Sequence, residues 1–153
     1  NSNNGSKNGK PSMLFMCDSN GKYLRLNKLC RKHKITYFRC PTIKAASDLI
    51  NETDTNQKPS IILFHTGTNG LENSDTKTIT ENIYKLLEAT SIKFPDSKIL
   101  FSTLLPRKDN VHSKSIEINN LIKLHVAKLK NIDEIDHLRS SMYTMPIYMT
   151  KNT

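Results

Sequence analysis

The chain has 153 residues, of which 36% are hydrophobic and 24% charged, and its formal net charge is +9. These values exclude an intrinsically disordered chain and predict one folded domain with its own core. The longest apolar runs, residues 13–17 and 61–64, have the length of strands and are too short for a membrane-spanning helix. We therefore expect no transmembrane segment.

The positive charge is concentrated in the first part of the chain. Residues 1–58 hold eleven Lys and Arg against four Asp and Glu, a balance of +7, which favours RNA or other anionic partners through salt-sensitive attraction. The three cysteines are too few and irregular for a disulfide framework or a zinc ribbon. They predict reduced thiols and an intracellular, cytoplasmic location. We expect residues 1–11 to be a flexible leader and residues 12–153 to form the domain.

Five strand-like segments alternate with amphipathic helical segments. This pattern predicts an α/β fold, a three-layer sandwich in which helices cover both faces of a five-stranded parallel sheet. The predicted strands are residues 13–17, 36–40, 60–65, 98–104 and 132–135, and the predicted helices are residues 20–34, 43–50, 76–93 and 115–129. Residues 138–153 show no clear period and are not assigned.

Two short polar segments follow predicted strands, at the edge of the sheet where ligands bind in folds of this class. They are Cys-Asp-Ser-Asn-Gly (17–21) and His-Thr-Gly-Thr-Asn-Gly (65–70). Taken alone, the first is a good helix cap and the second a good turn. Because they end adjacent central strands, we favour a common site.

The two segments resemble known sequence blocks. Asp18-Ser19 and Gly67-Thr68-Asn69 resemble the first and third blocks of the SGNH (GDSL-like) hydrolases. Four longer stretches together resemble the esterase domain of the first open-reading-frame protein of LINE-type retrotransposons, with gaps, from about residue 13 to residue 135. They are Met-Cys-Asp-Ser-Asn-Gly-Lys (16–22), Ile-Leu-Phe-His-Thr-Gly-Thr-Asn (62–69), Phe-Pro-Asp-Ser-Lys-Ile (94–99) and Leu-Pro-Arg-Lys-Asp (105–109).

The resemblance implies a flavodoxin-like SGNH fold and hydrolysis of a small acyl ester, acetyl or lipid-like, with no cofactor. Ser19 would be the nucleophile, and its own N–H and the Asn69 side chain would donate to the oxyanion, with Gly67 in the oxyanion loop. Further residues that would line the site are Asp18, Asn20, Cys40 and His65. For His65, a hydrogen-bonded core histidine is the alternative.

Three departures from the family pattern bear on activity. Gly70 stands where the third block usually continues with Asp, and Cys40-Pro41 stands where ordinary SGNH enzymes supply an oxyanion glycine. The Asp-x-x-His block is not found before the chain ends at Thr153. We therefore expect an incomplete triad, a fold without its C-terminal catalytic block, and little or no activity from this chain. A literal Asp109-Asn-Val-His112 is a weak alternative base, and a solvated loop leading into the next helix is the preferred interpretation.

A second hypothesis is a non-catalytic nucleic-acid-binding or assembly module. In it, Arg25, Lys28, Arg31 and Lys32 on the basic surface of the predicted helix 20–34 would contact phosphates. A merely solvated helix face is the commoner explanation, and few aromatic residues are interleaved for base stacking. No pair of His or Cys residues has the spacing of metal ligands, so no metal is predicted.

Overall fold

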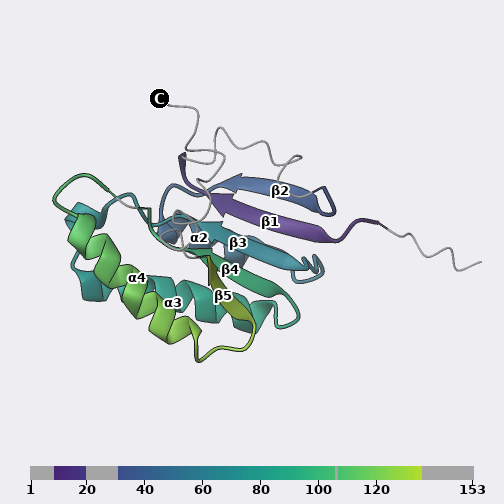
Figure 1. Cartoon of the computed structure of the whole chain (residues 1–153). Helices are drawn as coiled ribbons and strands as arrows, with labels where there is room; N and C mark the ends of the chain where they lie inside the picture. Colours follow the sequence, from purple (N-terminus) through teal and green to yellow (C-terminus); the bar gives the residue numbers. More distant parts are fainter. Residues whose placement is uncertain (1–8, 20–30, 106, 136–153) are drawn as a thin grey trace, which may run out of the picture.

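A computed structural model of the chain describes residues 9–19, 31–105 and 107–135. Its centre is a five-stranded sheet of order β2-β1-β3-β4-β5, in which every neighbouring pair is parallel (Figure 1). This is the flavodoxin-like order, with its switch point between β1 and β3. The strands are β1 (Ser12–Cys17), β2 (Lys34–Arg39), β3 (Ile61–His65), β4 (Lys98–Ser102) and β5 (Ile132–Ile135).

Three described helices begin after polar residues or tight turns. They are α2 (Ile43–Glu52), α3 (Thr76–Lys93) and α4 (His112–Val126), and a short 3-10 helix, η2 (Leu71–Asn73), precedes α3. The Thr42 hydroxyl accepts from the N–H of Ala45 at the start of α2, as Asp75 accepts from the N–H of Thr78 at the start of α3. These side chains satisfy N–H groups that have no partner within a helix.

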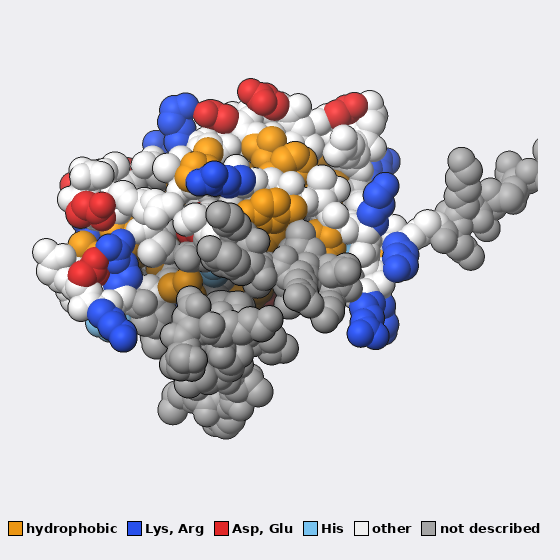
Figure 2. Space-filling view, turned by 90° about the horizontal axis from the view of Figure 1, so that it is seen from above, with side chains coloured by type: hydrophobic (Ala, Val, Ile, Leu, Met, Phe, Trp, Pro, Cys, Tyr) orange, Lys and Arg blue, Asp and Glu red, His pale blue; other side chains and the backbone are white. Residues whose placement is uncertain are grey.

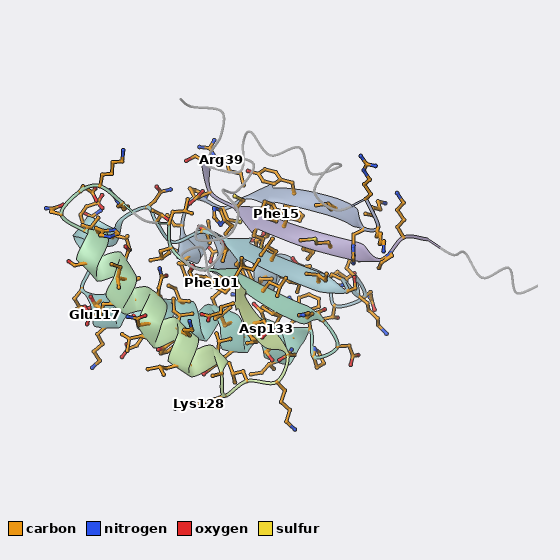
Figure 3. All side chains as sticks on the ribbon, in the orientation of Figure 1. Phe15, Arg39, Phe101, Glu117, Lys128 and Asp133 are labelled. Carbon is orange, nitrogen blue, oxygen red and sulfur yellow. The ribbon has the colours of Figure 1, made fainter. Side chains whose placement is uncertain are left out.

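All three helices pack on one face of the sheet (Figure 1). Side chains alternate along each strand, so Ile62, Phe64 and Phe101 point to the helices and are completely buried. Met13, Phe15 and Cys17 form a second buried cluster on the other face (Figure 3). Figure 2 looks down on that face and shows apolar side chains at its centre.

The five parallel strands and the α/β class confirm the prediction, while several element boundaries differ. The predicted helix 20–34 is wrong at its C-terminal end, because residues 31–33 form a turn and Lys34 begins β2; residues 20–30 lie outside the described residues. In the predicted sandwich, residues 20–34 supply the helix on the second face of the sheet, so that layer is not tested by the described residues. β4 ends at Ser102 rather than Leu104, because the backbone of Leu104 bonds the Asn119 side chain instead of a neighbouring strand.

The last helix begins and ends three residues earlier than predicted. Its hydrogen-bond ladder starts where the Val111 carbonyl accepts from the N–H of Ser115, so His112 is helical. It ends in a tight turn in which the N–H of Leu129 donates to the carbonyl of Val126. Within the described part of the chain, no helix is long and apolar enough to cross a bilayer. Residues 1–8 of the predicted leader and the unassigned segment 138–153 fall outside that part.

Candidate functional site

The two polar segments meet at the carboxyl ends of β1 and β3. Cys17 and His65 are register partners in these adjacent strands, and the N–H of Asp18 donates to the carbonyl of His65 at 3.0 Å. Because β2 lies on the other side of β1, the strand order reverses here, where ligands bind in open α/β sheets. The structure thus brings the predicted site segments to one edge.

Ser19 is exposed and follows Asp18, which is only 1% exposed. The backbone of Asp18, just before Ser19, is held by its bond to His65, while Ser19 itself is exposed to solvent. This position suits a nucleophile, whose role remains a prediction. Three other predicted residues, Asn20, Arg25 and Lys28, lie outside the described residues.

The loop after β3 is anchored to the end of β2. The Thr66 hydroxyl donates to the carbonyl of Cys40 at 2.7 Å, and the Asn69 side-chain amide donates to the carbonyl of Pro41 at 3.0 Å. Gly67 has a φ of +112°, which side-chain-bearing residues rarely adopt. The loop therefore has a defined conformation, and one N–H of the Asn69 amide is already engaged.

The end of β2 offers no oxyanion donor of the kind that SGNH enzymes place there. The N–H of Cys40 donates to the carbonyl of Cys17 at 2.8 Å, and Pro41 has no N–H. Cys40 is buried, and this burial raises the pKa of its thiol, which disfavours the nucleophilic thiolate. Cys40 is thus positioned as a packing residue beside the loop rather than as a reactive group.

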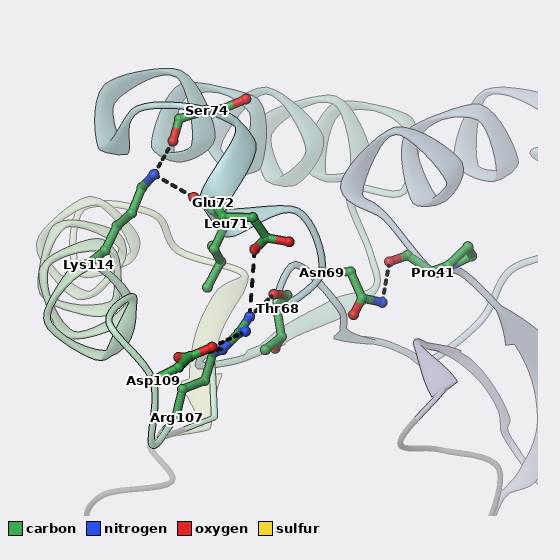
Figure 4. Close-up of polar contacts among 9 residues, drawn as sticks. All are labelled: Pro41, Thr68, Asn69, Leu71, Glu72, Ser74, Arg107, Asp109 and Lys114. Carbon is green, nitrogen blue, oxygen red and sulfur yellow. Dashed lines mark hydrogen bonds and ion pairs between the residues drawn. The ribbon is translucent and has the colours of Figure 1, made fainter.

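Arg107 clamps the other side of the same loop (Figure 4). Its guanidinium binds both carboxylate oxygens of Asp109, donates to the carbonyl of Thr68 at 3.1 Å and lies 3.9 Å from the Glu72 carboxylate. The Asp109 carboxylate raises the pKa of Arg107, so this cation is permanent. The sequence analysis assigned Arg107 no role, since nothing local indicates a contact with a residue 39 positions away.

Lys114 extends this support to η2. Its ammonium donates to the carbonyls of Leu71 and Ser74 (Figure 4). Lys114 lies in the first turn of α4, so α4 and the segment before it hold the loop after β3 through two cations. Sequence analysis missed this residue as well.

Asp109 and His112 are not arranged as the Asp–His pair that an alternative base would require. The Asp109 carboxylate is bound by Arg107, which lowers the pKa of that carboxyl group. Nδ1 of His112 accepts from the backbone N–H of Arg107 at 3.2 Å, whereas in a triad it donates to the carboxylate. The preferred alternative, a solvated loop, also needs correction, because His112 is the first residue of α4.

His65 lies between neighbouring strands. Nδ1 of its ring is 2.6 Å from the Ser102 hydroxyl of β4. Burial lowers the pKa of His65, and the opposing effect of the nearby Asp18 carboxylate is smaller, so the ring is neutral at pH 7. This geometry agrees with a hydrogen-bonded histidine at the sheet edge. A ring in this form keeps a lone pair on one nitrogen.

Comparison with known proteins finds solved structures with a similar fold. No protein-family model matches the sequence, and no curated protein matches it either. Among solved structures, a GDSL-like lipase from Bacteroides thetaiotaomicron is similar with a TM-score of 0.68 and 15% identity, over 91% of this chain and 73% of that one. A member of the lipolytic GDSL family from Veillonella parvula has a TM-score of 0.66 and 13% identity, over 87% and 84% of the two chains.

A serine-to-alanine mutant of an acetyl esterase, solved with an acetate ion, is also similar. Its TM-score is 0.64 at 15% identity, and the match covers 88% of this chain and 83% of that one. At these identities the comparisons establish a shared fold, that of the SGNH (GDSL-like) hydrolases. The chemistry of this chain has to be argued from its own residues.

We predict that Gly67→Ala destabilises the protein more than Gly70→Ala. Both glycines have positive φ, but a Cβ on Gly67 would lie 3.1 Å from Leu104 and 3.2 Å from Ile43, whereas a Cβ on Gly70 meets nothing within 4 Å. Left-handed backbone alone costs about 1–2 kcal/mol, and Gly67→Ala adds crowding in the core. Urea unfolding of the two variants measures the difference. Equal midpoints would contradict this account of Gly67.

We also predict that Arg107→Ala loosens the loop after β3 without unfolding the domain. The guanidinium holds the Thr68 carbonyl, so its loss should speed amide hydrogen exchange selectively in residues 67–74. Lys108→Ala, which removes an exposed cation one position along, is the matched control. Amide hydrogen exchange, followed by mass spectrometry, measures this rate in both variants. Unchanged exchange in Arg107→Ala would show that the clamp does not restrain the loop.

Proposed function

We propose that this chain is an SGNH-type serine ester hydrolase that acts on small acyl esters, with Ser19 as the nucleophile. The observation that carries the proposal is the pairing of β1 with β3. It puts Ser19 and the loop of Gly67 and Asn69 at the same edge of the sheet, at the switch point. The structural neighbours named as a lipase and an acetyl esterase support the same reaction class.

The proposed reaction is acyl transfer through a serine ester. The Ser19 hydroxyl oxygen would attack the ester carbonyl, the alcohol would leave, and water would then release the acid from the acyl-serine. The Asn69 amide has two N–H groups, and the one bound to the Pro41 carbonyl leaves a second for the oxyanion. The N–H of Ser19 would be a further donor.

We expect turnover by this chain to be weak. The end of β2 contributes no donor, because the N–H of Cys40 is bound to Cys17 and Pro41 has none. The Asp109–His112 alternative is not arranged as a base, and the Asp-x-x-His block is not identified in the sequence. A serine without a positioned base keeps only the rate enhancement supplied by oxyanion stabilisation and binding.

We further propose that the protein derives from a retrotransposon and is located inside the cell. The four sequence stretches that resemble the esterase domain of LINE-type retrotransposon proteins motivate a retrotransposon origin. The odd number of cysteines favours a reducing, intracellular compartment.

We predict that Ser19→Ala reduces hydrolysis of a chromogenic acetate ester to the level of the buffer. Asn69→Ala should lower kcat by about 10²- to 10³-fold, the usual effect of losing one oxyanion donor. Ser113→Ala, which changes an exposed serine of α4, is the control and should leave turnover intact. Steady-state kinetics on matched protein concentrations measures all three. Turnover by Ser19→Ala equal to that of the unchanged chain would reject Ser19 as the nucleophile.

A second candidate function, RNA binding, is favoured by a basic edge at the amino ends of the strands. Backbone bonds join Lys34 to Pro11, Ser60 to Ser12 and Lys98 to Ser60, so the strands begin side by side. Exposed basic residues gather on these segments, at the right-hand end of Figure 2. They are Lys10, Arg31, Lys32, Lys34, Lys58 and Lys98. This edge lies opposite the proposed esterase site.

Loss of two of these cations should weaken RNA binding and its salt dependence. We predict that Lys34→Ala with Lys58→Ala reduces the slope of log affinity against log salt by about 1.4 for single-stranded RNA, about 0.7 for each lost phosphate contact. Lys44→Ala with Lys77→Ala removes two exposed cations from α2 and α3 and is the control. Fluorescence anisotropy at several salt concentrations measures the slopes. Identical slopes for the two double variants would exclude this edge as the binding surface.

A further inference from the structure

Three residues with metal-binding chemistry come together where β1 and β3 end. The thiol of Cys17, the carboxylate of Asp18 and the ring of His65 each place one potential ligand atom within 4.8 Å of the other two. Across residues 9–19, 31–105 and 107–135, this is the one group of three such side chains that the structure gathers. Cys17 and Asp18 are buried and His65 is half-buried.

The pairing of β1 with β3 sets the arrangement of these three side chains. Cys17 and His65 are register partners on adjacent parallel strands and lie on the same sheet face as Phe15 and Leu63. Neighbouring strands run about 4.8 Å apart, which is the scale of a metal-ligand cluster. The bond from the Asp18 N–H to the His65 carbonyl fixes Asp18 against the end of β3. Ligands on strand ends are held more precisely than ligands on loops.

Ser102 supplies the kind of outer contact that metal-binding histidines have. Its hydroxyl is 2.6 Å from Nδ1 of His65 and comes from β4, the next strand of the sheet. Such a partner fixes the orientation of the ring and the nitrogen that faces the metal. With Nδ1 directed at Ser102, Nε2 would be the coordinating nitrogen in the proposed site.

The donor set selects the metal. A thiolate, an imidazole and a carboxylate are the ligands of zinc, at about 2.0–2.3 Å from the ion. We propose that Cys17, Asp18 and His65 bind one zinc ion, with solvent or a small exogenous donor in the fourth position. The three ligand atoms, all within 4.8 Å of one another, would move closer together to complete the tetrahedral shell.

This site does not depend on the proposed esterase function. Ser19 and Asn69 are absent from the ligand set, so Ser19→Ala should bind metal as the unchanged chain does. Loss of ester hydrolysis and loss of metal binding are therefore separable results. The two thiols of the described chain also give a matched pair, since Cys40 is as buried as Cys17 but is not in the cluster.

The test is titration of the metal-stripped, reduced chain with Co²⁺, followed by Zn²⁺. We expect one equivalent of Co²⁺ to produce a thiolate-to-cobalt charge-transfer band in the near ultraviolet and the visible bands of a tetrahedral ion, and Zn²⁺ to abolish both. Cys17→Ser should lose the charge-transfer band, while Cys40→Ser should keep it. Ser102→Ala should weaken binding by about 10–100-fold, as loss of an outer partner does.

Circular dichroism shows which variants fold. If Cys17→Ser does not fold, the isosteric variant Asp18→Asn provides the test. Asp18→Asn should lower the affinity for Zn²⁺ by at least about tenfold, because removal of a direct ligand has a larger effect than loss of an outer partner. The proposal is overturned if the unchanged chain shows no stoichiometric charge-transfer band, if the band persists in folded Cys17→Ser, or if folded Asp18→Asn binds Zn²⁺ as tightly as the unchanged chain.

Discussion

The in-register pairing of β1 with β3 is the constraint on which both proposed sites depend. Cys17 and His65 are partners because Ile62 and Phe64 point to the helices and are completely buried. A slip of one residue would turn those two apolar side chains to the other face and bring His65 into the core. Hydrophobic packing against the helices thus fixes the register, and the register fixes which polar groups meet at the carboxyl ends of the strands.

A small set of long-range contacts holds the loop after β3 in one conformation at the carboxyl edge of the sheet. Gly67 provides a backbone turn that side-chain-bearing residues rarely adopt, and Asn69 is tied to the end of β2. Arg107 and Lys114 hold the same loop from the opposite side. Because the loop is restrained from both sides, the Asn69 amide has a fixed position. The oxyanion role proposed for Asn69 would require such preorganisation.

The sequence predicted the sheet well because buried parallel strands and amphipathic helices have distinct periods. It failed where a distant partner decides the local structure. Lys34 fits a helical pattern, but its pairing with Ser12 makes it the first residue of β2. The contact of Arg107 with Thr68 joins two loops after different strands, and no local pattern encodes it. The cluster of Cys17, Asp18 and His65 could not be read from local sequence for the same reason, since Cys17 and His65 become neighbours only through strand order.

Two adjacent residues give this edge of the sheet two kinds of chemistry. Asp18 is buried and belongs to the cluster with Cys17 and His65, whereas Ser19 is exposed and faces solvent. A polar cluster on an otherwise apolar sheet face is costly unless its members are compensated by hydrogen bonds or charge. The Ser102 hydroxyl gives His65 a hydrogen-bond partner at Nδ1. In the two proposals the end of β1 would hold an ion on its buried side and present Ser19 as a nucleophile on its exposed side, because consecutive residues at a strand end differ in the environment they meet.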